Sequence, residues 1–272
     1  MSLVFDRPMV MGILNVTPDS FSDGGRFNAP DFALAHVEQM IKDGVDIIDI
    51  GGESTRPGAA AVSEQDEIER VVPLVEAIRS RFDVPISVDT SKPGVMRSAV
   101  VAGADMLNDV RALQEDGALL AAAELAVPVC LMHMQGEPRS MQQNPHYDDV
   151  TVDVLQFLRE RINACQAAGI TRDKLLVDPG FGFGKSLSHN LTLLKELDRF
   201  KSLELPLLVG VSRKSMIGAV LEKTVEQRLY GSLAAASLAL WQGASIIRAH
   251  DVAATKDIVK LCQAVLDVGS LD

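Results

Sequence analysis

The sequence predicts an α/β protein that folds as one (β/α)8 TIM barrel, with residues 1–272 forming a single domain. A chain of 272 residues suits one such barrel, which typically takes about 250. Short apolar runs alternate with helical patterns along the chain, and this alternation implies parallel strands. A polar residue follows nearly every run. This favours a barrel, whose strands end on one shared face, over an open doubly wound sheet.

Eight runs are expected to be strands buried on both faces, because they are short, apolar and rich in β-branched residues. The segment between Val45 and Gly58 illustrates the unit: a buried run is followed by glycines, hydroxyls, a guanidinium and a proline. A helix is expected over Ser63–Phe82, where valines and isoleucines recur at helical spacing. The expected strands are approximately Met9–Val16, Val45–Ile50, Pro85–Asp89, Asp105–Asp109, Val127–Met132, Leu175–Asp178, Leu207–Val211 and Ser245–Ala249.

Composition limits the classes of partner and compartment. The net charge of -11 argues against nucleic acid or an anionic membrane as the main partner. The three cysteines, Cys130, Cys165 and Cys262, show no metal-binding spacing, and reduced thiols are expected of them. Residues 1–12 lack the pattern of a signal peptide, and no apolar run is long enough to span a membrane. We therefore expect a cytoplasmic protein.

Polar residues at the carboxyl ends of the expected strands form the main pattern. Any one of them can be explained as a helix cap or a turn former. Together they are better explained by a barrel, because its strand ends converge on the face where the active site lies. These residues are Asn15, Asp89, Asn108, His133, Asp178, Ser212 and His250.

Three segments carry groups suited to phosphate. Ser54, Thr55 and Arg56 follow two glycines and offer hydroxyl, guanidinium and backbone N–H donors. The segment 212–215 and the pair Arg248 and His250 follow the last two strands, where barrels commonly hold phosphate. Alternate residues of a strand point the same way, so Arg248 and His250 are expected to share one target.

Two acids and an amide suggest a second kind of ligand. Asp89, Asn108 and Asp178 follow buried runs and need hydrogen-bond partners there. With Lys214 nearby they match a flat heterocycle that carries amino, ring N–H and carbonyl groups. Metal ligation by the aspartates and general acid–base catalysis remain open alternatives.

Two glycine-bearing loops, 15–25 and 180–184, carry Phe21 and Phe183, which are placed to clamp a ring or to close over a substrate.

Taken together, these motifs resemble the dihydropteroate synthases, the folate-pathway family targeted by sulfonamides. The matching pieces run in order along nearly the whole chain: Asn15–Gly25, Ile48–Gly58, Ser87–Pro93, Asn108, Leu131–Gln135, Asp178–Lys185, Val209–Ile217 and Ile246–Asp251. The resemblance implies a reaction in which (7,8-dihydropterin-6-yl)methyl diphosphate and 4-aminobenzoate give 7,8-dihydropteroate and diphosphate, with Mg²⁺. It also implies inhibition by sulfonamides and a homodimer, whose face is expected on the small-residue segment Ser232–Trp241.

The resemblance further implies a role for each matched residue. The implied pterin set is Asp89, Asn108, Val110, Met132, Asp178, Phe183, Gly210 and Lys214. The implied diphosphate set is Asn15, Thr55, Arg56, Arg248 and His250, with Asn15 contacting magnesium. The implied 4-aminobenzoate set is Phe21, Thr55, Arg56, Pro57, Phe183, Ser212 and Lys214. Lys214, Arg248, His250 and Asp178 are expected to act in catalysis.

The chemistry of these substrates favours a dissociative, SN1-like substitution. Breaking the methylene–oxygen bond leaves a cation that the electron-rich dihydropterin ring shares, so the protein need not supply a nucleophile. Its larger task is to stabilise the departing diphosphate. Two alternatives are a methyltetrahydrofolate:corrinoid methyltransferase, which has no need of residues 55–57 or 212–215, and a non-catalytic pterin-binding paralogue, which would be expected to lose diphosphate residues.

Overall fold

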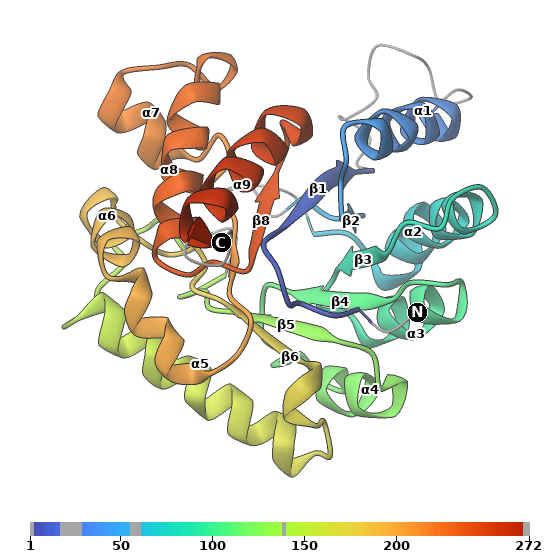
Figure 1. The fold of residues 1–272 in the computed structure, drawn as a ribbon. Coiled ribbons are helices and arrows are strands. Elements are labelled where there is room, and N and C mark those ends of the chain that lie inside the picture. The colour runs from blue at the N-terminus through green and yellow to red at the C-terminus, as the bar shows by residue number, and fades with distance from the viewer. Residues whose placement is uncertain (1–2, 17–28, 55–60, 138–139, 269–272) are drawn as a thin grey trace.

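Eight parallel strands curl into a barrel surrounded by helices (Figure 1). This computed structural model describes residues 3–16, 29–54, 61–137 and 140–268. The strand order is β6-β5-β4-β3-β2-β1-β8-β7, and a parallel bridge between Val177 and Leu207 brings the two edges of the sheet together. The predicted barrel is thereby confirmed. The strands are β1 Met9–Asn15, β2 Ile47–Gly51, β3 Ile86–Asp89, β4 Met106–Asp109, β5 Val129–Met132, β6 Leu175–Asp178, β7 Leu208–Val209 and β8 Ile246–Ala249.

The helices lie outside the strands and follow the expected alternation (Figure 1). In the described residues they are α1 Ala29–Lys42, α2 Glu64–Arg79, α3 Pro93–Val101, α4 Ala118–Leu125, α5 Val150–Ala167, α6 Leu187–Lys195, α7 Ser215–Leu221, α8 Leu229–Trp241 and α9 Val252–Leu266, with short 3₁₀ turns η2 Arg172–Lys174, η3 Leu197–Leu203 and η4 Val225–Gln227. Among these helices, none is both long and apolar enough to cross a lipid bilayer.

Element boundaries differ from the predicted ones by a few residues. The helix expected over Ser63–Phe82 is α2, which begins one residue later because the Ser63 hydroxyl accepts from Asp66 N and caps the helix. The strand expected over Leu207–Val211 narrows to Leu208–Val209. Beyond it the chain turns at Val211, whose carbonyl accepts from Lys214 N.

Two apolar cores hold the barrel together. The larger lies between the outward faces of the strands and the helices. The smaller fills the barrel interior and is made by Met9, Met11, Ile47, Met106, Cys130, Leu176, Leu208 and Ile246. This smaller core forms the lower layer, or floor, of the barrel interior. Residues on a strand alternate between its two faces, so the next inward-facing position lies two residues further along. The side chains two positions further along six of these strands therefore form the next layer toward the carboxyl ends.

Candidate active site

The layer above the interior floor contains four of the eight residues predicted to bind the pterin ring. Moving two residues along six strands from the floor gives Asp49, Asn108, Met132, Asp178, Gly210 and Arg248. Asp49, Asn108 and Asp178 are all buried there. Polar groups in such a place must be hydrogen-bonded to be tolerated. The period of two thus places a polar, charged layer directly on an apolar barrel floor.

Arg248 lies at the centre of this layer. Its Nε donates to Asp49 Oδ2 at 2.6 Å, and its Nη2 donates to Asp89 Oδ2 at 3.0 Å. Asn108 Nδ2 also donates to Asp49 Oδ2, at 3.2 Å. Asp49 Oδ1 is buried and has no hydrogen-bond partner within the described part of the chain. The guanidinium therefore joins β2, β3 and β8. Among the described residues, Asp49 Oδ1 remains an unpaired acceptor inside the barrel mouth, which is the end of the barrel where the carboxyl ends of the strands meet.

Burial brings the pKa values of two carboxyl groups in the barrel mouth close to neutral pH. Desolvation raises the pKa of Asp89 to about 7, although the charge of Arg248 opposes the shift. Desolvation likewise raises the pKa of Asp178 to about 6, against the N–H of Gly180 and the charge of Lys214. Desolvation and the charge of Arg248 lower the pKa of Lys214 to about 8. Groups with such shifts in one concave face are typical of a binding or catalytic site.

Three of the residues predicted for diphosphate, Asn15, Arg248 and His250, lie on the same face. Ser212 Oγ lies 3.0 Å from His250 Nδ1 and accepts from His250 N at 3.2 Å. Loss of water around the ring and the charge of Arg248 lower the pKa of His250 to about 4, so this imidazole is neutral at pH 7. Asn15 is the last residue of β1. Its Oδ1 and the Asp89 side chain both lie close to Gly51: a Cβ added at Gly51 would be 3.4 Å from Asn15 Oδ1 and within 4 Å of Asp89. The ends of β1, β2, β3 and β8 thus converge.

Phe183 and Lys214 meet at the rim. The Lys214 ammonium lies 4.2 Å from the centroid of the Phe183 ring, which is a cation–π contact. Val110 and Met132 are buried at the ends of β4 and β5, and Gly210 follows β7. Phe21, Thr55, Arg56 and Pro57 lie outside the described residues.

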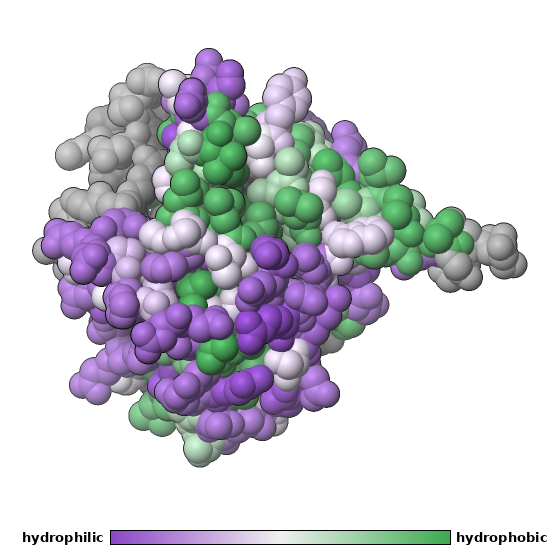
Figure 2. Space-filling model, turned by 90° about the vertical axis from the view of Figure 1, so that its left-hand side faces the viewer, coloured by the Kyte–Doolittle hydropathy of each residue, from purple (hydrophilic) through white to green (hydrophobic). Residues whose placement is uncertain are grey.

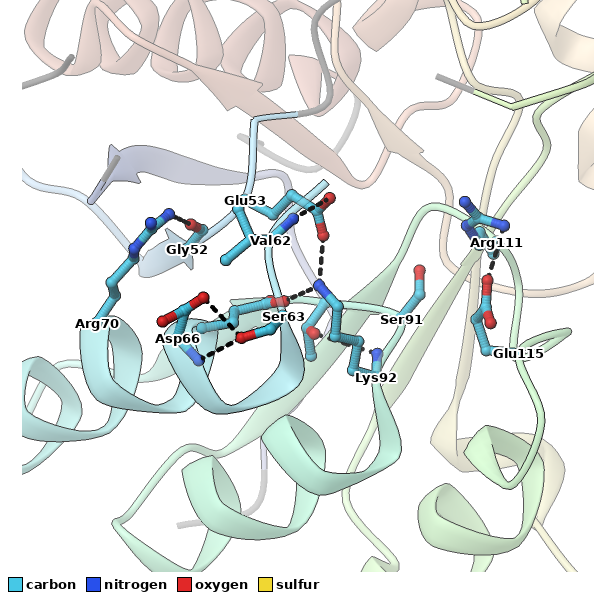
Figure 3. Close-up of polar contacts among 12 residues, drawn as sticks. Gly52, Glu53, Val62, Ser63, Asp66, Arg70, Ser91, Lys92, Arg111 and Glu115 are labelled. Atoms are coloured by element: carbon cyan, nitrogen blue, oxygen red, sulfur yellow. Dashed lines mark hydrogen bonds and ion pairs between the residues drawn. The ribbon is translucent and has the colours of Figure 1, made fainter. Parts of the chain in front are cut away.

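An ion-pair cluster that sequence reasoning missed fastens the connection between β2 and α2 (Figure 3). The Lys92 ammonium pairs with both Glu53 and Glu67, and Glu67 is almost fully buried. Glu53 Oε1 also accepts from Val62 N at 3.3 Å, and Arg70 Nη1 donates to Gly52 O at 3.0 Å. The two ends of the β2–α2 connection, residues 52–53 and 62–63, are therefore linked to each other and to α2.

Sequence reasoning also assigned no role to Asp49 and Lys185. The signal for Asp49 was its place between two isoleucines of a buried strand, at the period of two from Ile47 and Gly51. Lys185 follows the glycine-rich loop and is only 2% exposed, and nothing in the sequence indicates that its ammonium is buried. His133, one of the polar residues expected at a strand end, has its Nδ1 2.9 Å from Lys185 Nζ.

The described residues contain no group of three or more histidine, cysteine, aspartate or glutamate side chains that could hold a metal ion. Cys130 belongs to the barrel floor, as expected, and burial raises the pKa of its thiol well above the usual range. The mouth therefore offers neither a protein-built metal cage nor an activated thiol among these residues. It offers acceptors for a flat polar ring and, beside them, cations and hydroxyls for an anion.

A barrel with this charged layer is the architecture of a pterin-binding enzyme. Residues 11–250 match the family described as Pterin binding enzyme. A dihydropteroate synthase of Haemophilus influenzae is 59% identical over 257 residues, covering 94% of each chain. One of Escherichia coli K12 is 57% identical over 265 residues, covering 97% of this chain and 94% of the relative.

Solved structures agree with these sequence relatives. A Yersinia pestis dihydropteroate synthase in complex with a sulfonamide drug superposes with a TM-score of 0.94 at 56% identity, covering 98% of this chain and 97% of the other. A Xanthomonas albilineans dihydropteroate synthase with 4-aminobenzoic acid gives a TM-score of 0.92 at 53% identity, covering 97% and 95%. The chain belongs to the pterin-binding enzyme family and, within it, to the dihydropteroate synthases, which are transferases. The methyltransferase alternative is not supported by these relatives.

Proposed function

We propose that this chain condenses (7,8-dihydropterin-6-yl)methyl diphosphate with 4-aminobenzoate to 7,8-dihydropteroate and diphosphate at the barrel mouth. The observation that carries the proposal is the layer of Asp49, Asn108, Asp178 and Arg248 on the apolar floor, with Lys214 above it. Relatives solved with 4-aminobenzoic acid and with a sulfonamide support the choice of second substrate and of inhibitor class.

The roles we propose follow the chemistry of each group. The carboxylates of Asp89 and Asp178 and the amide of Asn108 bind the amino, ring N–H and carbonyl groups of the pterin, with Val110, Met132 and Gly210 around it. Arg248, His250 and Asn15 bind the diphosphate. Ser212, Phe183 and Lys214 line the 4-aminobenzoate side. Phe21, Thr55, Arg56 and Pro57 keep the roles expected from the resemblance.

In the proposed mechanism the methylene–oxygen bond breaks first, and the dihydropterin ring shares the positive charge. The ionised carboxylates around the ring favour that charge, while Arg248 and the N–H groups of the mouth stabilise the diphosphate as it leaves. The amine of 4-aminobenzoate then forms the new bond to the methylene carbon, and its proton passes to solvent or diphosphate. The protein thus binds, orients and neutralises charge, and it supplies no nucleophile.

Magnesium suits this mouth as a companion of the diphosphate. Mg²⁺ is commonly held by one or two protein oxygens together with substrate phosphates and water. The amide oxygen of Asn15, at the end of β1 and close to Gly51 and Asp89, suits such a partly protein-bound ion. We propose that Asn15 contacts the ion, which when bound neutralises charge on the leaving diphosphate.

We also propose a homodimer, residence in the cytoplasm, and a single domain over residues 1–272. Figure 2 shows hydrophobic side chains gathered over the face on which α7 and α8 lie. On α8, Tyr230 is 81% exposed, and Leu238 and Trp241 are exposed as well, while α7 exposes Val220 and Leu221. An apolar surface of this kind is typical of a subunit interface. The expected dimer segment Ser232–Trp241 contributes its exposed side chains to it.

The experiment that tests the reaction is an assay of diphosphate and dihydropteroate with purified protein, the dihydropterin diphosphate and Mg²⁺, with and without 4-aminobenzoate. Dihydropteroate formed only with both substrates, and lost in Lys214→Ala and Asp178→Ala but not in the exposed-site control Lys195→Ala, supports the proposal. Diphosphate release without the amine supports the dissociative order, and an absolute need for the amine before cleavage counts against it. Pterin binding without turnover would favour a binding protein.

A further inference from the structure

Lys185 is a buried lysine that the proposed mechanism does not use. It follows the loop Gly180–Gly184, and 2% of it is exposed. Its Nζ lies 2.9 Å from Gly180 O, 3.0 Å from Phe183 O and 2.9 Å from His133 Nδ1, with His133 O at 3.4 Å. An ammonium has three N–H donors and no acceptor. All three donors are therefore committed to the loop and to the residue that follows β5.

These partners are neutral, and burial lowers the pKa of the Lys185 amine to about 7, so its charged and neutral forms are both populated at neutral pH. Among the described residues, none forms an ion pair with Lys185. Taking an ammonium out of water is costly unless acceptors replace the water. Here two carbonyls of one loop and an imidazole replace it. The carbonyl oxygens of Gly180 and Phe183 thus both point toward the Lys185 ammonium.

The loop depends on this inward arrangement. Gly180 has φ +72, and a Cβ there would lie 1.9 Å from His133 O, so the loop rests directly on the end of β5. Phe183 N donates to Gly180 O at 3.1 Å, so the Gly180 carbonyl accepts hydrogen bonds from both Phe183 N and Lys185 Nζ. From outside, Tyr147 Oη donates to Gly184 O at 2.7 Å, and Gly182 N donates to Asn190 Oδ1 at 2.7 Å.

His133 fits the same arrangement. When the Lys185 amine is protonated it donates to Nδ1, and the imidazole proton is then on Nε2. Burial and the charge of Lys185 lower the pKa of His133 to about 2, so the ring remains neutral beside the lysine. The ring packs edge-on against Phe157, with centroids 4.9 Å apart. His133 is therefore an acceptor and a packing element, and not a donor to substrate through Nδ1.

The loop in turn carries Phe183 to the rim. With the Phe183 carbonyl turned inward to Lys185, its ring lies against Lys214, whose Nζ is 4.2 Å from the ring centroid. A Cβ at Gly182 would lie 3.2 Å from Lys214 Cδ, so this lysine also lies along the loop backbone. Lys185 donates its hydrogen bond to the Phe183 carbonyl, and no hydrogen bond found within the described residues joins Lys185 to Lys214.

We propose that Lys185 is a positioning residue: its ammonium gathers the carbonyls of Gly180 and Phe183 onto His133 and thereby holds the Phe183 ring beneath Lys214. This inference rests on the proposed function in assigning Phe183 and Lys214 to the substrate site. It goes beyond that function in giving the reaction a buried lysine that acts through the loop backbone and binds neither substrate.

The test is a double-mutant cycle between Lys185→Met and Phe183→Ala. Methionine keeps the unbranched shape of the side chain, one heavy atom shorter, and removes its amine and therefore its donors. Misplacement of a substrate-positioning group by about 1 Å can cost about 10²-fold in rate, and we expect Lys185→Met to lower kcat/KM by roughly that factor. In the Phe183→Ala background the same change is expected to cost less than about threefold, because the ring it positions is gone.

Thermal melting separates positioning from simple destabilisation. The loss of melting temperature caused by Lys185→Met is expected to be the same in both backgrounds, whereas its effect on kcat/KM is not. Lys185→Arg, which keeps the charge and the donors, is expected to restore part of kcat/KM. Lys195→Met, at an exposed lysine of α6, is the control and is expected to change neither quantity.

Equal losses of kcat/KM from Lys185→Met in both backgrounds would overturn the proposal. If Lys185→Met does not fold, Lys185→Arg and Lys185→Gln enter the same cycle, and equal losses with and without Phe183 overturn the proposal in the same way. If the wild-type protein forms no dihydropteroate, the proposed function fails. The cycle is then measured on calorimetric binding of the dihydropterin diphosphate, where non-additivity with Phe183→Ala still supports the positioning role.

Discussion

Arg248 and Asp49 form an ion pair across the barrel interior, with Nε 2.6 Å from Oδ2 and the carboxylate fully buried. The two residues are 199 positions apart in the sequence, and they face each other because β8 and β2 both flank β1. The pair fixes the guanidinium that also contacts Asp89. It therefore sets the position of the central cation of the mouth.

Asp49→Asn is expected to lower kcat/KM by about 10- to 100-fold, because the Arg248 guanidinium loses its charged partner and gains freedom to move. Steady-state kinetics with both substrates check this. Asp46→Asn is the matched control, since Asp46 pairs with Arg7 and Lys256 at the opposite end of the barrel. It is expected to lower the melting temperature without changing kcat/KM. An Asp49→Asn enzyme with wild-type kcat/KM would contradict the role of Asp49 in positioning the Arg248 guanidinium.

Asp178 is expected to destabilise the free protein at neutral pH. Its folded pKa of about 6 lies above its usual value, so the folded state binds the proton more tightly than the unfolded state. The penalty is absent below about pH 4, grows as pH rises, and is complete above about pH 6. Asp178→Asn is thus expected to raise stability by about 1–3 kcal/mol at pH 8 and by little at pH 4, measured by denaturant unfolding. Equal increases in the free energy of unfolding at pH 4 and pH 8 would refute the pH-dependent penalty of Asp178.

Binding of a dihydropterin without the diphosphate is expected to weaken as pH falls. The Asp178 carboxylate accepts from the ring only when ionised, and below pH 6 most of it is protonated. Calorimetric affinity at pH 5 is expected to be at least about tenfold lower than at pH 7.5, given a pKa of about 6 for Asp178 and the further protonation of Asp89, whose pKa is about 7. Asp178→Asn should bind more weakly and with a flatter profile. A profile that keeps its slope in this variant would assign the dependence to another group.

Lys92→Met is expected to destabilise the protein by about 2–4 kcal/mol, because it leaves the Glu67 carboxylate buried without its cation. The second partner, Glu53, is more exposed, so it contributes less. Chemical unfolding of Lys92→Met, Glu67→Met and the double variant measures the coupling. The double variant is expected to be more stable than Lys92→Met alone. Additive losses would mean that the two side chains do not stabilise each other.

Tyr230→Glu is expected to shift the protein from dimer to monomer, because it puts a charge on the exposed apolar face of α8. Sedimentation velocity over a range of concentrations measures the assembly. Val101→Glu is the matched control: Val101 is also an exposed apolar residue, on α3. A dimer that survives Tyr230→Glu unchanged would place the interface elsewhere.

The sequence indicated most of the residues in the charged mouth, because each follows a recognisable apolar run. Asp89, Asn108 and Asp178 were found in this way, and the structure places them where β3, β4 and β6 end. Asp49 and Lys185 were missed for a physical reason. Their importance comes from desolvation and from partners contributed by other elements, and neither property is encoded in local spacing.

By itself the sequence determined the barrel, the order of its elements and the face on which its polar residues meet, because strand alternation and apolar periodicity are local properties of the chain. Only the tertiary structure decided which charges pair. Arg248 selects Asp49 and Asp89, and Lys92 selects Glu53 and Glu67. Lys185 turns to backbone carbonyls in place of a carboxylate. These choices depend on the closure of the barrel, which brings distant strand ends within hydrogen-bonding distance and removes the water that would otherwise compete.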